Sequence, residues 1–253
     1  YKNYHAMTRI YLSLLFCALF AAGSLGQSPY RYQFRTGREL GFGVAALGLG
    51  GFSYSFQNRN TPLSAGQIAA LDRTAIPRFD RWATDQNSRS ARRWSDALLY
   101  ASTLLPVLLH LPDKPVREDF LGIGALYAET AFLNLALTNF VKNTTRRTRP
   151  YAYHPEVPLA DKTTVDTRQS FYSGHTSHSA AMCFLAASIY ADYHPESPWK
   201  PVVWAAAASI PAATGLLRIR GGKHFPTDVI IGYVAGAAIG WGIPRLHRMR
   251  RDP

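Results

Sequence analysis

The chain has 253 residues, 47% of them hydrophobic, and its 28 Lys and Arg against 16 Asp and Glu give a formal net charge of +12. This length fits one large domain or two small ones, and the absence of internal repeats and low-complexity tracts excludes a solenoid. The positive charge suits a nucleic acid, an anionic lipid surface or an anionic substrate, and charge alone does not choose among them.

Residues 7–26 have the pattern of a secretory signal peptide. Met7-Thr8-Arg9 supplies a short positive start, an apolar run extends from Ile10 to Ala22, and Ser24 and Gly26 are small residues at the place of cleavage. The apolar run is shorter than the ~20 residues that a membrane helix needs. We therefore expect cleavage after this segment, with an uncleaved N-terminal anchor as the alternative.

Six apolar blocks follow the signal. Their richness in Ala, Leu and Gly favours helices over strands, and we predict an all-α fold, a bundle of about six helices embedded in a membrane. One block is long enough for a comfortable span, whereas the others fit either tilted short spans or buried helices of a soluble bundle. The blocks are Leu40 to Phe56, Ala97 to Leu111, Phe120 to Val141, Ser179 to Ala191, Val202 to Leu217 and Val229 to Ile243.

A polar stretch separates the first two blocks and contains apolar residues at the spacing of an amphipathic helix interrupted at Pro77. These residues are Ile68, Leu71, Ile76, Phe79 and Trp82. We divide the chain into an N-terminal helical and amphipathic region over 27–95, a core over 96–246 and a basic tail over 247–253.

Three motifs near the ends of apolar blocks contain the groups that phosphoryl transfer without a metal requires. Lys and Arg side chains neutralise phosphate oxygens, and a guanidinium can bind two oxygens at once. The first motif runs from Lys142 to Arg149-Pro150, the second is Ser173-Gly174-His175, and the third consists of Arg218, His224 and Asp228. We expect Lys142, Arg149 and Arg218 to donate hydrogen bonds to the phosphate.

The second and third motifs predict the remaining parts of the site. Ser173 has the residue type of a helix N-cap, so the backbone N–H groups of Gly174 and His175 would point at the anion. The carboxylate of Asp228 can accept a hydrogen bond from one ring nitrogen of His224. The other ring nitrogen is then free to attack phosphorus, giving a phosphohistidine. His175 would then protonate the leaving oxygen.

The three motifs together resemble the signature of the type 2 phosphatidic acid phosphatase and vanadium haloperoxidase superfamily, in its membrane lipid phosphatase branch. The resemblance covers about residues 95 to 245. It implies a helical bundle with a metal-independent phosphatase site, in which Lys142, Arg149, Ser173, Gly174 and Arg218 bind phosphate and His175, His224 and Asp228 are catalytic. Tyr172 and Leu217 depart from the usual pattern, which has proline and serine at those positions, and neither is a catalytic group.

We therefore predict a phosphatase that hydrolyses a lipid phosphate or an isoprenoid diphosphate without a cofactor or a metal. The alternatives are a soluble periplasmic acid phosphatase for small phosphate esters and a vanadium-dependent haloperoxidase. We expect a membrane and a lipid phosphate as partners and no nucleic acid. The basic tail, by the positive-inside rule, would be cytoplasmic and would place the active site on the periplasmic face of a bacterial inner membrane; a periplasmic location is the alternative.

The predicted topology has an internal conflict. A cleaved signal followed by six spans would return the tail to the outer side, so either Leu40 to Phe56 does not span or the signal remains as an anchor. Within the longest block, Glu129 is a candidate functional residue, because an ionisable side chain inside a membrane span is costly.

Overall fold

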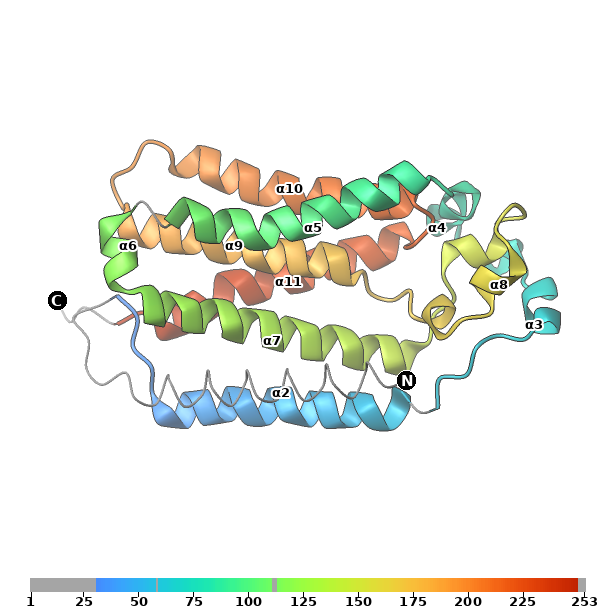
Figure 1. Cartoon of the computed structure of the whole chain (residues 1–253), viewed down its shortest axis with the longest axis horizontal. Helices are drawn as coiled ribbons and strands as arrows, with labels where there is room; N and C mark the ends of the chain where they lie inside the picture. Colours follow the sequence, from blue (N-terminus) through green and yellow to red (C-terminus); the bar gives the residue numbers. More distant parts are fainter. Residues whose placement is uncertain (1–30, 58, 111–112, 250–253) are drawn as a thin grey trace.

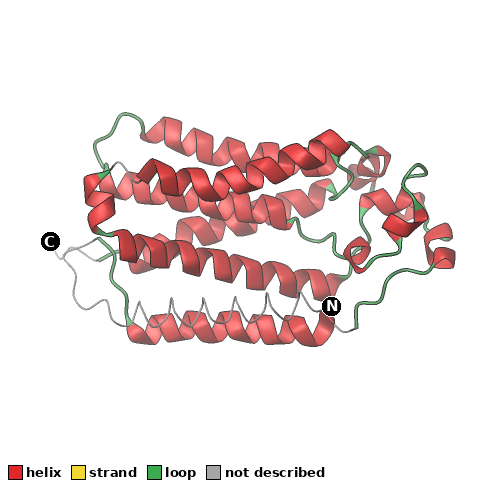
Figure 2. Ribbon diagram, viewed as in Figure 1, coloured by secondary structure: helices red, strands yellow, loops and turns green. Residues whose placement is uncertain are grey.

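The structure, a computed structural model, describes residues 31–57, 59–110 and 113–249. The predicted signal at 7–26 and the end of the basic tail at 250–253 lie outside the described residues. Six long helices lie side by side in a bundle (Figure 1), and the described residues are otherwise short helices and loops (Figure 2). The long helices are α2 (Thr36–Gln57), α5 (Arg89–His110), α7 (Phe120–Thr145), α9 (Gly174–Tyr193), α10 (Lys200–Arg220) and α11 (Pro226–His247).

Each of the six predicted apolar blocks corresponds to one long helix, and the all-α prediction is confirmed. Helix α9 lies at the centre, in contact with α5, α7, α10 and α11, while α2 packs on the outside of α7. The helices extend beyond the blocks where polar residues form their first turns. Helix α5, for example, begins at Arg89 and therefore crosses the predicted region boundary between residues 95 and 96.

Glycines set the close packing of α11 against α9. A Cβ atom at Gly236 would lie 2.0 Å from the carbonyl oxygen of Ser177, and Cβ atoms at Gly232 and Gly240 would lie 2.7 and 2.1 Å from the carbonyl oxygens of Ser173 and Ala181. Only a residue without a side chain leaves room for this approach. The glycine spacing in α11 therefore brings the starts of α9 and α11, which carry two of the motifs, directly together.

Three segments are long and apolar enough to cross a membrane: Phe120–Tyr153, which contains α7, Lys200–Arg220 and Pro226–His247. Large apolar side chains also cover the outside of the bundle. Val44 on α2 and Tyr100 on α5 have 70% and 67% of their surface exposed. Exposed apolar surface on several helices is typical of a bundle that contacts lipid.

The short helices gather at one end of the bundle, where α5, α9 and α11 begin and α7 and α10 end (Figure 1). They are α3 (Ala65–Ala69), α4 (Arg78–Arg81) and α8 (Leu159–Lys162), with 3₁₀ turns at Arg73–Ala75, Trp82–Asp85, Pro150–Tyr153 and Val165–Arg168; α6 (Lys114–Glu118) lies at the other end.

The predicted amphipathic helix is not formed as one element. Asp72 caps a 3₁₀ turn by accepting from the backbone N–H of Thr74 at 2.7 Å, and Pro77 starts α4, so the segment bends repeatedly. Ile76 is buried, whereas Phe79 and Trp82 are exposed. The apolar residues of this segment therefore lie on separate short turns that cover the end of the bundle.

Candidate active site

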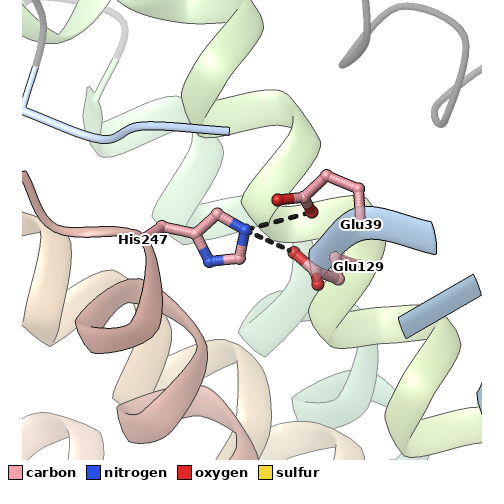
Figure 3. Close-up of side chains that lie close together, drawn as sticks. All are labelled: Glu39, Glu129 and His247. Carbon is pink, nitrogen blue, oxygen red and sulfur yellow. Dashed lines mark hydrogen bonds and ion pairs between the residues drawn. The ribbon is translucent and has the colours of Figure 1, made fainter. Parts of the chain in front are cut away.

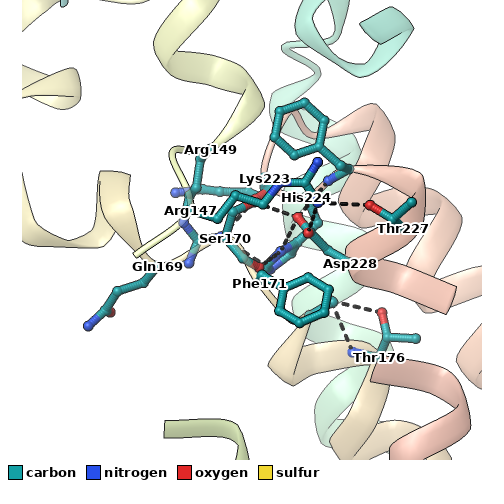
Figure 4. Close-up of polar contacts among 12 residues, drawn as sticks. Arg147, Arg149, Gln169, Ser170, Phe171, Thr176, Lys223, His224, Thr227 and Asp228 are labelled. Carbon is teal, nitrogen blue, oxygen red and sulfur yellow. Dashed lines mark hydrogen bonds and ion pairs between the residues drawn. The ribbon is translucent and has the colours of Figure 1, made fainter. Parts of the chain in front are cut away.

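The three motifs meet at the end of the bundle that the short helices cover (Figures 1 and 4). The last turn of α7 carries Lys142, the last turn of α10 carries Arg218, and the first turn of α9 carries His175. His224 lies in the loop between α10 and α11, and Asp228 lies in the first turn of α11. Residues far apart in the sequence are thus brought to one place by antiparallel helices.

Local sequence fixes the loop that holds His224. Gly222 has a positive φ of 68°, and a Cβ atom there would lie 2.2 Å from the carbonyl oxygen of Gln86, so a side chain is excluded. Pro226 occupies the first turn of α11, where a missing N–H costs nothing. The Asp228 carboxylate accepts from the backbone N–H of Phe225 at 2.9 Å and caps the helix.

His224 is held in one tautomer by a backbone carbonyl. Its ring, 1% exposed, donates from Nδ1 to the carbonyl oxygen of Ser170 at 2.7 Å, because a carbonyl can only accept. The expected bond from Asp228 is longer, with 3.6 Å between Oδ2 and Nδ1. The Nε2 atom keeps its lone pair and lies 3.1 Å from Nη1 of Arg149, which donates to it. The ring therefore presents an unprotonated Nε2 to the cations.

Asp228 contacts Ser170, the residue whose carbonyl accepts from the His224 ring (Figure 4). Its carboxylate accepts from the Ser170 hydroxyl at 2.5 Å and from Nη1 of Arg147 at 2.5 Å. Arg147 also donates to Asp80 at 2.7 Å, and Asp80 accepts from the hydroxyl of Thr227 at 2.6 Å. Both carboxylates are almost fully buried and each is paired, as buried charges require.

Arg149 is fixed by four hydrogen bonds and is 5% exposed. Its Nε and Nη2 donate to the backbone and side-chain oxygens of Asp166 at 2.8 and 2.7 Å, and its Nη1 donates to the carbonyl of Lys223 at 2.8 Å as well as to His224. Most of its donors are thus used by the protein. Nη1 is the part of the guanidinium that faces the reactive nitrogen.

Arg218 has spare donor capacity. Its Nη1 lies 3.3 Å from both Ser95 Oγ and Asp96 Oδ1, and its Nε is buried and has no partner among the described residues. An unpaired buried donor is costly, and an anion beside it would satisfy it. This orphaned N–H is therefore the clearest mark of an anion site.

His175 is paired with Asp96, whose Oδ1 lies 2.8 Å from its Nε2. Burial and the neighbouring Arg218 lower the pKa of His175 to about 4, and the hydrogen bond with Asp96 opposes this shift. Asp96 thus contacts both the imidazole and the guanidinium of Arg218 and fixes their relative positions.

Lys142, Ser173 and Gly174 complete the predicted set. The Lys142 ammonium donates to the carbonyl of Gln169 at 2.6 Å. Ser173 is fully buried and caps α9, with 3.4 Å between its Oγ and the Thr176 backbone nitrogen. A Cβ atom at Gly174 would lie 3.7 Å from Lys142 Cε, so the start of α9 lies against this lysine.

The electrostatics of His224 follow from its neighbours. Burial lowers the pKa of its imidazole well below the ordinary value, and Arg149, Lys142, Arg218 and His175 lower it further. Each of these groups disfavours a second positive charge at the same place. The same concentration of positive charge favours a bound anion.

The sequence motifs did not indicate Asp80, Asp96 or Ser170, and Arg147 was passed over although it lies inside the first motif. Ser170 lies three residues before the second motif, and no pattern in the sequence marks it as functional. Asp80 and Asp96 lie in polar surroundings without a recognisable spacing. Their partners are 67 to 147 residues away in the chain, so only the fold reveals them.

An all-α bundle with a buried histidine surrounded by cations at one end defines a helical protein with a candidate anion-binding centre. The PAP2 superfamily model matches residues 123–252, half of the chain, and the chain belongs to this superfamily. The chain is 36% identical over 94 residues to the probable diacylglycerol pyrophosphate phosphatase 1 of Schizosaccharomyces pombe, covering 35% of this chain and 34% of that protein. It is 33% identical over 76 residues to phospholipid phosphatase 1 of Rattus norvegicus, covering 28% and 27%.

The chain thus spans about a third of the length of the curated relatives that it matches. Among solved structures it is similar to the transmembrane PAP2 type phosphatidylglycerolphosphate phosphatase of Bacillus subtilis. The similarity covers 80% of this chain and 96% of that one, at 18% identity and a TM-score of 0.46.

Proposed function

We propose that this protein hydrolyses the phosphate or diphosphate group of a lipid through a phosphohistidine at His224. The observation that carries the proposal is the buried Nε of Arg218, which has no partner among the described residues and lies in the same site as the unprotonated Nε2 of His224. A phosphate oxygen would satisfy the donor while phosphorus lies before the nucleophile. The geometry supports binding and attack by groups of this chain alone.

In the first step His224 Nε2 attacks phosphorus and the bond to the leaving oxygen breaks. Arg149 Nη1, Arg218 and Lys142 stabilise the charge on the equatorial oxygens, and the positive end of α9 adds to them. When the phosphate binds, before this attack, Arg149 Nη1 exchanges its contact with the ring for a phosphate oxygen, which frees the Nε2 lone pair. The Ser170 carbonyl accepts a hydrogen bond from Nδ1–H throughout, which stabilises the positive ring of the intermediate.

His175 donates the proton that the leaving oxygen requires. Burial and the neighbouring Arg218 lower its pKa, and the negative charge of a bound phosphate raises it. Binding of the substrate therefore favours protonation of the acid. In the second step His175 accepts a proton from water, which attacks the phosphohistidine and releases phosphate.

A lipid is the substrate class that the surroundings favour. Three candidate spans reach the site, and exposed apolar side chains surround the bundle, so an acyl or isoprenoid chain can remain in the membrane while its headgroup binds. Relatives named as phosphatases of diacylglycerol pyrophosphate and phospholipids support the same class.

The test is phosphate release by the purified full chain in mixed micelles from phosphatidate, diacylglycerol pyrophosphate, an isoprenoid diphosphate and a soluble phosphate ester. We expect turnover of at least one lipid substrate, and loss of it in His224→Ala. His194→Gln, which changes a histidine paired with Asp113 at the other end of the bundle, is the matched control. Turnover of the soluble ester alone would exclude the lipid assignment, and full activity of His224→Ala would exclude the mechanism.

A further inference from the structure

A second group of chemically active side chains lies at the opposite end of the bundle from the phosphate site. Glu39 at the start of α2, Glu129 on α7 and His247 at the end of α11 point toward one another (Figure 3). His247 Nε2 lies 3.2 Å from an oxygen of each glutamate. The imidazole is fully buried, and Glu39 is 7% exposed.

The hydrogen bond of His247 Nδ1 leaves its Nε2 facing the two glutamates. His247 Nδ1 lies 2.9 Å from the carbonyl oxygen of Ile243, which can only accept, so Nδ1 carries a proton and donates to it. If the ring carries only this proton, Nε2 has a lone pair directed at two carboxylate oxygens, which are also acceptors. A metal-binding histidine commonly has this arrangement, with its second nitrogen donating to a backbone carbonyl.

The other carboxylate oxygens of Glu39 and Glu129 also favour a bound cation. Oε1 of Glu39 accepts from the guanidinium of Arg38 at 2.9 Å and from the backbone N–H of Arg35 at 3.2 Å, whereas its Oε2 faces the histidine. Oε1 of Glu129 is buried and has no hydrogen-bond partner among the described residues. A buried carboxylate oxygen without a partner is expensive, and a cation bound by both oxygens would satisfy it.

We propose that Glu39, Glu129 and His247 bind one divalent transition-metal ion of the Zn²⁺ class. Ligands placed tetrahedrally at about 2.0–2.1 Å from such an ion lie roughly 3.3 Å apart, close to the two distances of 3.2 Å found here. All three ligand atoms lie within 4.8 Å of one another. One imidazole and two carboxylates suit zinc, whereas calcium and magnesium prefer six or more oxygens.

The ion would act as a structural clamp. Helix α2 precedes the part of the chain that matches the superfamily and packs mainly on α7. A metal held by one residue each from α2, α7 and α11 links this outer helix to the core. The phosphate chemistry lies at the other end of the bundle and takes no part in it (Figure 1).

The competing description is a metal-free triad in which His247 is an imidazolium that donates to a carboxylate. To separate the two, the full chain in detergent is stripped with a chelator and titrated with Zn²⁺, while bound metal and the thermal midpoint are measured. We expect one Zn²⁺ per chain and a midpoint that rises by about 5 °C or more at a hundredfold excess over the dissociation constant. X-ray absorption should show one imidazole nitrogen together with oxygen ligands.

Matched variants locate the ion. Glu129→Gln and His247→Gln should lose both the bound Zn²⁺ and the shift, while Glu118→Gln, which changes an exposed glutamate of α6 at the same end, should keep them. His224→Ala should also keep them, which distinguishes this site from the phosphate site. A stripped wild type that binds no Zn²⁺ and does not change its midpoint would overturn the proposal, as would unchanged binding in Glu129→Gln.

Discussion

The Nδ1–H group of His224 donates a hydrogen bond to the backbone carbonyl of Ser170 at 2.7 Å, so the tautomer of the proposed nucleophile is set by the main chain. Asp228, the expected orienting residue, instead accepts from the Ser170 hydroxyl at 2.5 Å and stabilises the segment that carries the carbonyl. The orientation of the ring therefore depends on the carboxylate indirectly.

Asp228→Asn should keep measurable activity. The variant weakens a buried charged hydrogen bond but leaves the Ser170 carbonyl in place, so kcat should fall by about 10- to 100-fold. His224→Ala, which removes the nucleophile, should abolish turnover. The measurement is steady-state phosphate release by both variants on one lipid substrate, and equal loss in the two would show that the carboxylate acts directly on the ring.

The pH profile should report the lowered pKa of His224. Protonation removes the Nε2 lone pair, so activity is lost as pH falls through the pKa of this ring, which lies well below its ordinary value of 6.5. The acidic limb of kcat/KM should therefore lie below pH 6.5. Arg149→Gln removes the neighbouring charge that lowers the pKa most, and its residual activity should show the limb at higher pH. A limb at or above pH 6.5 in the wild type would contradict this account.

The loss of activity in His175→Ala should be larger for a leaving group that needs a proton than for one that leaves readily as an anion. Loss of a general acid costs about 10²- to 10⁴-fold with an alcohol that needs a proton, and much less with an aryl phosphate whose anion leaves readily. The measurement compares His175→Ala with the wild type on a lipid phosphate and on an aryl phosphate. An equal loss on both substrates would assign His175 to binding rather than to proton transfer.

The Asp96→Asn variant tests the group that supports this acid. The carboxylate raises the pKa of His175 through its hydrogen bond, so its removal should move the alkaline limb of the pH profile toward lower pH. An unchanged limb would show that Asp96 only positions Arg218.

The contact between α9 and α11 predicts a contrast between two glycines of the same helix. Gly236→Ala places a Cβ atom 2.0 Å from the Ser177 carbonyl oxygen, and overpacking of this kind costs about 1–3 kcal/mol. At Gly242 nothing lies within 4 Å, and alanine should stabilise the helix by up to about 1 kcal/mol. Thermal unfolding of both variants in detergent measures the difference, and equal stability would contradict the packing.

Much of the fold could be predicted because each apolar block of the sequence forms one long helix of the bundle. Each block needed a helix to satisfy the hydrogen bonds of its backbone. The segment that contains Pro77 was misjudged because apolar spacing alone does not distinguish one helix from successive short turns. Caps such as Asp72 decide that question locally.

The site was harder to predict completely. Residues at fixed spacing in the motifs, such as His224 and Asp228, were found, whereas Asp96 and Asp80 were not, because their roles arise from contacts across the fold. Glu129 was singled out for its position inside an apolar block, and its partners Glu39 and His247 could not be inferred from spacing. Long-range pairing of charges is a property of helix packing rather than of local sequence.

The central claim is that His224 forms a covalent bond to phosphorus, and trapping of that intermediate tests it most directly. The wild type is mixed with a lipid carrying a labelled phosphate, quenched in base during the first turnovers, and digested for mass spectrometry. The account predicts a base-stable, acid-labile phosphate on the peptide that contains His224, and none in His224→Ala. Turnover by the wild type without this label, or a label on another residue, would contradict it.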